Sequence, residues 1–360
     1  MNRRIVVTGA SGNVGTSVVR ELSTDPAVGS IIGIARRRPE WSCEKLTWEV
    51  ADLADERTDL GPLLGGADVV IHLAWMFQPA RDPVTTWRTN VLGGIRLFDA
   101  VARAGVPSLV YASSVGAYSP GPKDRKVTED WPTHGWPAAS YPREKSYLER
   151  VLDTYERDHP EVRVVRMRPT FLFKRESASE QRRLFAGPLV RGGMVRFVPV
   201  VPDVPGLRLQ ALHTDDAARA YRLAALGDIR GPVNLATDPV LDAAMLAEIL
   251  GARVVKLPAA ALRGPLAAAW RLHATPASPD LFDAALRLPL LDATRAHTEL
   301  GWQPDHDAAA AVSELLAGMR DGAGMATPPL TPDRRPVTRR KRRAGPGSLS
   351  RYFREKSSRG

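Results

Sequence analysis

Short runs of apolar, often β-branched residues alternate along the chain with longer segments in which apolar residues recur every three or four positions. The short runs predict buried strands of a parallel sheet, and the longer segments predict helices on both of its faces. We expect strands at 5–8, 31–35, 46–50, 69–73, 109–112, 162–167 and 233–236. We expect helices at 14–22, 85–104 and 141–158. The predicted fold is α/β, a Rossmann-like doubly wound parallel sheet.

The alternation loosens after Pro169, which predicts a second, smaller α/β domain in the C-terminal half. We place the sheet domain at 1–170, with a return of the chain near 207–236, and the second domain mainly at 171–325. This region includes the segment 241–250 and an Ala-rich stretch at 258–273. A helix is expected at 294–300, ending before Gly301.

Composition separates the end of the chain from the rest. The formal net charge of the 360 residues is +10, and residues 331–360 alone carry +9. Residues 326–360 are also rich in Pro, Gly and Ser, so we predict a disordered basic tail. Such a tail could contact an anionic partner (nucleic acid, lipid or protein), or it could be a solvated extension without a ligand.

Other features of the composition favour a cytoplasmic protein. Cys43 is the only cysteine, so no internal disulfide can form. The first predicted strand begins within about five residues of Met1, which leaves no room for a secretory signal. No apolar run reaches the ~20 residues of a membrane span. The seven histidines show no metal-ligand spacing, so we expect no metal.

A glycine-rich turn follows the first predicted strand. Three glycines spaced three apart let backbone amides approach a pyrophosphate, and the next helix points its positive end at it. A plain tight turn is the alternative reading. The segment is Thr8-Gly9-Ala10-Ser11-Gly12-Asn13-Val14-Gly15.

The end of the second predicted strand bears on the choice of cofactor. An acidic residue here would bind the ribose 2′-hydroxyl of NAD. The chain instead has Ala35 followed by Arg36, Arg37 and Arg38, and a guanidinium suits a 2′-phosphate. This favours NADP, with NAD possible, unless the three arginines only form a solvated loop.

Tyr141 and Lys145 lie one helical turn apart, with Pro142 suited to the first turn. A nearby ammonium stabilises a phenolate, so we expect Lys145 to lower the pKa of Tyr141 and make it a proton donor and acceptor. A surface lysine beside a half-buried tyrosine is the alternative.

Taken together, these segments resemble the extended short-chain dehydrogenase/reductase superfamily, the NAD(P)-dependent epimerase/dehydratase group. The resemblance runs from Asn2 to about Leu316. It is carried by the glycine turn and by Asp52-Leu53, Ile71-His72-Leu73-Ala74, Thr89-Asn90-Val91, Tyr111 to Tyr118, Tyr141 to Lys145, Arg168-Pro169 and His213 to Ala217.

The resemblance implies a role for each matching residue. It implies that Ser114, Tyr141, Lys145 and Asn90 serve catalysis, with Asn90 supporting the site. It implies cofactor contacts for Thr8, Gly9, Ser11, Gly12, Asn13, Val14, Gly15, Arg36, Arg37, Asp52, Leu53, Leu73, Ala74, Lys145 and Pro169. It also implies that the second domain binds the substrate and that the chain forms a homodimer, for which 85–104 is a candidate face.

The chain departs from the family pattern in two places. After Arg168-Pro169 it lacks the Gly-Pro and asparagine that meet a sugar diphosphate, although Lys174, Arg175, Arg182 and Arg183 could meet an anionic substrate or form a solvated face. Ser114-Val115-Gly116 stands where sugar dehydratases place Thr-Asp-Glu, which disfavours dehydration. Trp75, Met76, Phe77, Trp131 and Trp136 could shape an apolar substrate site or close a domain interface.

We therefore predict an NAD(P)-dependent oxidoreductase that transfers hydride between nicotinamide and the alcohol or carbonyl of a small-molecule substrate. One alternative is a nucleotide-sugar epimerase that retains its NAD. An alternative of another class is a non-catalytic dinucleotide sensor.

Overall fold

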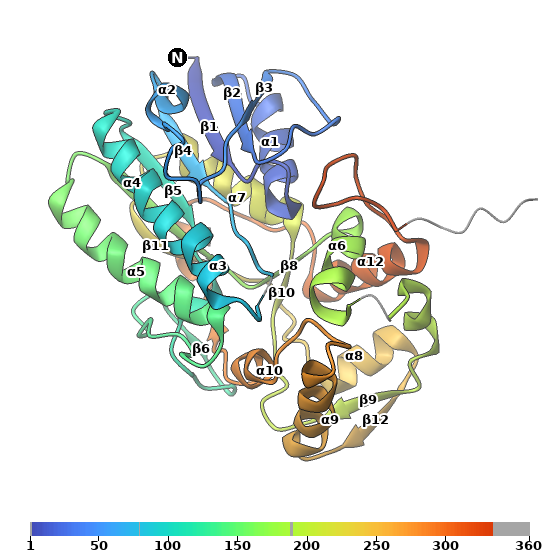
Figure 1. Cartoon of the computed structure of the whole chain (residues 1–360). Coiled ribbons are helices and arrows are strands. Elements are labelled where there is room, and N and C mark those ends of the chain that lie inside the picture. Colours follow the sequence, from blue (N-terminus) through green and yellow to red (C-terminus); the bar gives the residue numbers. More distant parts are fainter. Residues whose placement is uncertain (1, 79, 188–189, 334–360) are drawn as a thin grey trace, which may run out of the picture.

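A seven-stranded parallel sheet forms the centre of the molecule in the computed structural model, which describes residues 2–78, 80–187 and 190–333 (Figure 1). The strand order is β11-β7-β5-β4-β1-β2-β3. The strands are β1 (Arg3–Thr8), β2 (Val28–Ala35), β3 (Leu46–Val50), β4 (Val69–His72), β5 (Ser108–Ala112), β7 (Arg163–Pro169) and β11 (Gly231–Leu235). All seven strands predicted from the sequence are present, so the predicted fold class is confirmed.

Helices cover both faces of this sheet because alternate strand residues point to opposite sides. Ile5 and Val7 of β1 are buried with residues of α1 (Asn13–Thr24) and α7 (Thr214–Leu226). Val6, between them, is buried with residues of α4 (Gly93–Arg103) and α5 (Ser140–Asp158). Figure 1 shows α4 and α5 side by side on one side of the sheet. Each face therefore has its own apolar core.

The helix predicted over 85–104 is divided into three consecutive pieces. They are α3 (Pro83–Trp87), a π-helical turn η1 (Arg88–Leu92) and α4. The π turn carries Asn90, which is 1% exposed and whose side chain binds groups outside its own helix. Periodicity could not reveal this interruption, since a π turn changes the hydrogen-bond spacing and not the apolar pattern.

The C-terminal half adds short elements below the carboxyl ends of the strands, where Figure 1 shows α8, α9 and α10 grouped with β9 and β12. Parallel pairs join β8 to β10, β9 to β12 and β6 to β13. The strands are β6 (Lys126–Val127), β8 (Phe171–Phe173), β9 (Val200–Asp203), β10 (Ala211–His213), β12 (Arg253–Lys256) and β13 (Leu290–Leu291). The remaining helices are α2 (Gly61–Leu64), η2 (Val115–Ala117), η3 (Arg175–Ser177), α6 (Ala178–Gln181), η4 (Arg182–Ala186), η5 (Gly192–Phe197), α8 (Ala243–Leu250), α9 (Ala259–Arg271), α10 (Pro279–Ala285), α11 (Thr294–Thr298) and α12 (Ala308–Asp321).

The prediction of a disordered tail from residue 326 is wrong for its first eight residues. Leu330 is fully buried, and the Met325 amide donates to its carbonyl at 2.7 Å. The Trp41 amide donates to the Ala326 carbonyl, and Arg183 donates to the carbonyl of Pro329. Segment 326–333 is therefore packed on the body, and the rest of the predicted tail, 334–360, lies outside the described residues.

Within the described residues, no helix is both long enough and apolar enough to cross a membrane.

Candidate active site

Two adjoining cavities open at the carboxyl ends of the central strands, the edge of an α/β sheet where ligands usually bind. One, which we call the β2 cavity, has a volume of about 400 Å³ and lies at the ends of β2 and β3. The other, which we call the β5 cavity, has a volume of about 500 Å³ and extends from the end of β5 toward α10. Both cavities are lined by Gly9, Gly12 and Leu73, so they meet over the glycine turn.

Each glycine of the turn has its own steric role. Gly9 has a φ of +69°, and a Cβ there would lie 2.6 Å from the amide nitrogen of Ala74. A Cβ on Gly15 would lie 2.2 Å from the carbonyl oxygen of Gly9, so helix α1 could not pack as closely. A Cβ on Gly12 would have that oxygen, at 3.4 Å, as its one neighbour within 4 Å. Gly9 and Gly15 therefore permit close packing, and Gly12 leaves the backbone open to a ligand.

Positive charge gathers beside this turn. Helix α1 begins after Gly12 without a side-chain cap, so its first amides are free to bind an anion. The Lys174 ammonium lies next to this end and donates to the Asn13 carbonyl at 2.9 Å and the Thr16 hydroxyl at 2.7 Å. Burial lowers the pKa of Lys174 to about 8, with Asp215 acting in the opposite direction. The turn therefore fits a pyrophosphate.

The β2 cavity is lined by many of the residues that we predicted to contact the cofactor, including those near the ribose 2′-position. Ala35 ends β2 beside it, and Arg36 and Arg37 line it with exposed side chains. Arg38 is exposed and does not line it. Its other predicted lining residues are Thr8, Ser11, Asp52, Leu53, Leu73 and Ala74. The Asp52 carboxylate and the guanidinium groups of Arg36 and Arg37 thus share one space, which Arg183 and Glu180 also line.

Ser114 and Tyr141 meet at the β5 cavity. Ser114 follows β5 and lines the cavity together with Tyr141, and its hydroxyl accepts a hydrogen bond from the Gly116 amide at 2.9 Å. The neighbouring Ser113 faces the other way, since its hydroxyl donates to Glu149. Tyr141 begins α5 and packs against Phe77, with ring centroids 4.8 Å apart. The geometry thus places Ser114 beside the phenol.

Lys145 also lines the β5 cavity, but it does not act on Tyr141 as the sequence suggested. Its ammonium donates to the Ala112 carbonyl at 2.6 Å and lies 3.4 Å from the centre of the Trp75 ring. Burial lowers the pKa of Lys145 well below its usual value, although Glu149 and Glu144 raise it. Burial likewise raises the pKa of Tyr141 to about 12, and the Ser114 hydrogen bond lowers it. The expectation of a lowered Tyr141 pKa is wrong for this structure because desolvation dominates.

Asn90 lines neither cavity and positions two segments that do. Its amide oxygen accepts from the Met76 amide at 2.7 Å, and its amide nitrogen donates to the Met76 carbonyl. The same nitrogen donates at 2.7 Å to Glu144, which precedes Lys145 on α5. Asn90 therefore connects the loop after β4 to the helix that carries Tyr141 and Lys145.

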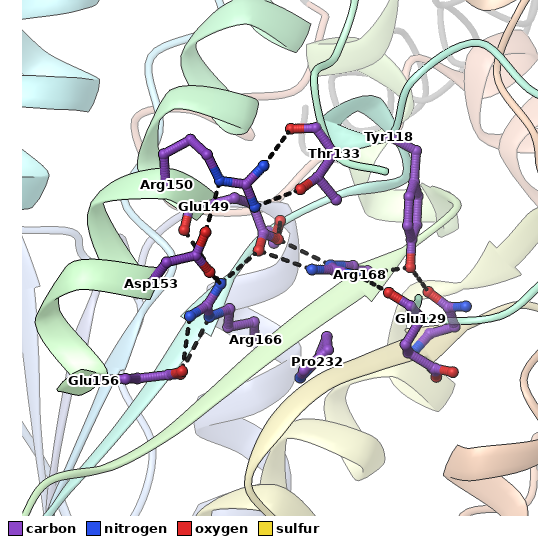
Figure 2. Close-up of polar contacts among 12 residues, drawn as sticks. Tyr118, Glu129, Thr133, Glu149, Arg150, Asp153, Glu156, Arg166, Arg168 and Pro232 are labelled. Carbon is purple, nitrogen blue, oxygen red and sulfur yellow. Dashed lines mark hydrogen bonds and ion pairs between the residues drawn. The ribbon is translucent and has the colours of Figure 1, made fainter. Parts of the chain in front are cut away.

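A buried ionic network holds α5 against β7 behind the site. Figure 2 shows Glu149 of α5 between Arg166 and Arg168 of β7, with Asp153 and Glu156 also bound to Arg166. Burial acts to raise the pKa of Glu149, but hydrogen bonds and charge from the two arginines hold it at about 2. Glu149 also accepts from Ser113, so the network fixes the strand end that carries Ser114.

The pattern of these residues agrees with a family comparison. The model of the NAD dependent epimerase/dehydratase family matches residues 5–227, more than half of the chain. The chain belongs to this family. The match covers the glycine turn, Ser114, Tyr141 and Lys145.

Individual relatives are more distant. An uncharacterized protein of Mycobacterium tuberculosis is 24% identical over 327 residues, which cover 87% of this chain and 83% of the relative. A UDP-glucose 4-epimerase of Mycolicibacterium smegmatis is 32% identical over 163 residues, 42% of this chain and 51% of that enzyme. The crystal structure of the Thermus thermophilus UDP-glucose 4-epimerase in complex with NAD aligns with a TM-score of 0.65 at 19% identity, over 88% of this chain and 99% of that one.

Every residue of this chain that we predicted to contact the cofactor lines one of the two cavities. Those not yet placed, Asn13, Val14, Gly15 and Pro169, line the β5 cavity. Of the five aromatic and Met positions offered as a substrate site, Trp75 and Phe77 line both cavities, and Met76 lines the β2 cavity. Trp131 and Trp136 line neither.

Several residues that shape the site were missed in the sequence. Glu180 lines both cavities, and burial raises its pKa to about 7. Pro328 and Pro329 line the β2 cavity from the C-terminal segment. Leu281 and other residues of α9 and α10 line the far side of the β5 cavity. No motif or periodicity in the sequence predicted a place at the site for these residues, because long-range packing brings each of them there.

Another cluster of possible ligand atoms brings together His213, Asp216 and His306, within 4.8 Å of one another. Hydrogen bonds already engage these groups. His213 accepts from the Asp215 amide and contacts Glu314, and Asp216 accepts from the Asp305 and His306 amides. The cluster connects β10, α7 and the segment before α12, as expected for a buried structural histidine.

Proposed function

We propose that the protein is a nicotinamide-dependent enzyme that interconverts an alcohol and a carbonyl compound at the β5 cavity. The observation that carries this proposal is that Ser114, Tyr141 and Lys145 line one cavity together with Gly9 and Gly12 of the glycine turn, with Lys145 one helical turn from Tyr141. A pyrophosphate on the glycine turn would leave the β5 cavity for the nicotinamide and the substrate.

The proposed chemistry divides among three side chains. When bound, the nicotinamide supplies or accepts the hydride. Ser114 orients the substrate oxygen by a hydrogen bond, and Tyr141 gives its phenolic proton to that oxygen during reduction or receives it during oxidation. Lys145, whose ammonium has Ala112 and Trp75 as partners, lines the same cavity one helical turn from Tyr141 and would hold the ribose of a bound nicotinamide.

We propose NADP as the preferred cofactor. Arg36 and Arg37 line the β2 cavity, and no described residue bonds their side chains, so both are free to meet a 2′-phosphate. The double variant Arg36→Ala/Arg37→Ala should weaken NADPH binding by about tenfold or more and leave NADH binding nearly unchanged. Arg38→Ala is the matched control and should change neither. Equal binding of NADPH and NADH by the wild type would overturn the preference.

A nucleotide-sugar epimerase is the second candidate. It is favoured by two of the three relatives named above, which are UDP-glucose 4-epimerases. An epimerase of this kind would retain its cofactor through the reaction, whereas an oxidoreductase would exchange it. Denaturing the purified protein and measuring released dinucleotide separates the two, since about one equivalent per chain supports the epimerase.

Replacing the phenol tests the catalytic assignment. Tyr141→Phe should lower the turnover of carbonyl substrates by about 10²- to 10⁴-fold, because it removes the proton donor. Tyr155→Phe, on the same helix, is the control, since the Tyr155 hydroxyl is buried and has no partner among the described residues. Steady-state rates of NADPH consumption give the comparison. Equal turnover by Tyr141→Phe and wild type would sink the proposal and favour a non-catalytic dinucleotide sensor.

A further inference from the structure

The part of the β5 cavity beyond Tyr141 is lined by apolar side chains from four elements. Phe171 comes from β8, and Leu184 and Phe185 come from η4. Leu266 of α9 and Leu281 and Phe282 of α10 form the opposite wall. Phe185 also packs against Phe77, with ring centroids 5.0 Å apart, so this wall continues to the face of Tyr141.

Charge is scarce in this cavity. Among the described residues only two charged side chains line it, Lys145 and Glu180. The Lys145 ammonium is already bound by Ala112 and covered by Trp75, and Glu180 would repel an anion. A nucleoside diphosphate carries at least two negative charges and needs cations or free amides. The β5 cavity offers it no free cation.

The four basic residues that could have met an anionic substrate are engaged elsewhere. Lys174 lies beneath the first turn of α1, with 1% of its surface exposed. Arg175 pairs with Asp321. Arg182 and Arg183 both pair with Asp333, and Arg183 also donates to the carbonyls of Pro329 and Thr331. Lys174 is therefore buried beside the glycine turn, so the alternative of a solvated face is wrong for this residue. The two η4 arginines hold the C-terminal segment.

Resting on the proposed function, we propose that the substrate is an uncharged, largely apolar alcohol or ketone rather than a nucleotide sugar. Its oxygen would bind between Ser114 and Tyr141, and its apolar body would lie between η4 and α10. Each methylene group buried there contributes about a fourfold gain in affinity.

Binding of a neutral fluorescent probe tests this proposal without any turnover. N-phenyl-1-naphthylamine should bind the wild-type protein with bright emission and should be displaced by apolar ketones but not by UDP. Leu281→Glu should weaken probe binding by about tenfold or more, because a carboxylate would be placed in the apolar wall. Leu272→Glu is the control and should have no effect, since Leu272 is 79% exposed just after α9 and does not line the cavity. If Leu281→Glu fails to fold, Phe282→Ala is measured instead and should also weaken probe binding, because Phe282 lines the same wall.

A turnover experiment separates failure of this inference from failure of the proposed function. With NADPH present, kcat/KM should rise along a series of cyclic ketones of increasing size, and UDP-glucose should not react when NADP+ or NAD+ is supplied as the hydride acceptor. If UDP displaces the probe, or UDP-glucose reacts and Tyr141→Phe abolishes that reaction, the apolar substrate class is overturned while the catalytic assignment survives. If apolar ketones react equally well with Tyr141→Phe, the proposed function fails instead.

Discussion

Glu180 is a half-buried acid that lines both cavities. Burial raises its pKa to about 7, against a usual value of 4.5, with Arg183 and Lys174 acting in the opposite direction. The carboxyl group is therefore protonated in the folded chain at a pH where the unfolded chain has already released its proton. It follows that the free energy of unfolding falls as the pH rises from about 4.5 to 7.

Glu180→Gln should remove this pH dependence. We expect the variant to be more stable than the wild type at pH 8, by at most about 3 kcal/mol, and nearly equal to it at pH 4. Urea unfolding at both pH values measures the difference. Glu176→Gln, in the neighbouring turn, should change stability by no more than about 0.5 kcal/mol at either pH. A constant difference between Glu180→Gln and wild type across this range would contradict the account.

At the scale of residues, the motif brings the predicted cofactor residues together, since all of them line one of the two cavities. It did not predict the partners of the basic residues after β7. Lys174 meets Asn13 and Thr16, and Arg182 meets Asp333, contacts between residues more than 150 positions apart. No local pattern distinguishes a lysine that will be buried under a helix from one that will be solvated. The pKa of Tyr141 was missed for a related reason, since its burial depends on Trp75 and Phe77 from the loop after β4.

At the scale of elements, the geometry of the site depends on the ionic contact between α5 and β7. Glu149 lies on the same helix as Tyr141 and Lys145 and is fully buried. Its carboxylate neutralises the positive charges of Arg166 and Arg168. Its pKa of about 2 is below the usual 4.5, so its contribution to stability is present above pH 4.5 and is lost as the pH falls toward 2.

Glu149→Gln should lower the free energy of unfolding at pH 7 by about 3–5 kcal/mol, because two buried guanidinium groups lose their counter-charge. The deficit should shrink as the pH falls from about 4.5 toward 2, where the wild-type carboxylate is itself neutralised. Asp153→Asn is the matched control, since Asp153 binds the same Arg166 but is half exposed, and should cost about 1 kcal/mol or less. Equal losses in the two variants would show that the network is not centred on Glu149.

Elements of the sheet domain could be predicted because parallel strands buried on both faces are continuous apolar runs, and their helices carry one clear apolar face. The predicted helix 294–300 corresponds to α11. The segments 241–250 and 258–273, for which no helix was predicted, contain α8 and α9. The π turn at Asn90 and the packed segment 326–333 were missed. Both are held by side chains or carbonyls from distant segments, Glu144 and Met76 for the first and Arg183 for the second.

On the scale of the whole molecule, apolar side chains remain exposed on the face formed by α3, η1 and α5. Val84 is 67% exposed, Leu92 43% and Tyr147 44%. We propose that this face, which includes part of the predicted 85–104 segment, forms a homodimer interface. Light scattering should give twice the chain mass of 39.2 kDa for the wild type.

Leu92→Glu should return the mass to that of one chain, because the substitution places charge in the apolar contact. Leu272 is also exposed, but it follows α9 and does not belong to this face. Leu272→Glu should therefore leave the dimer intact. A monomeric wild type, or a dimer that is insensitive to Leu92→Glu, would rule out this face.

Transfer of a deuterium label tests the central claim most directly. The protein is incubated with NADPH that carries deuterium at the reactive C4 position, together with an apolar cyclic ketone, and the product alcohol is analysed by mass spectrometry. We predict one deuterium on the carbinol carbon in the wild type and at least about a hundredfold less labelled product with Tyr141→Phe. Unlabelled product, or equal labelling by wild type and Tyr141→Phe, would contradict the account.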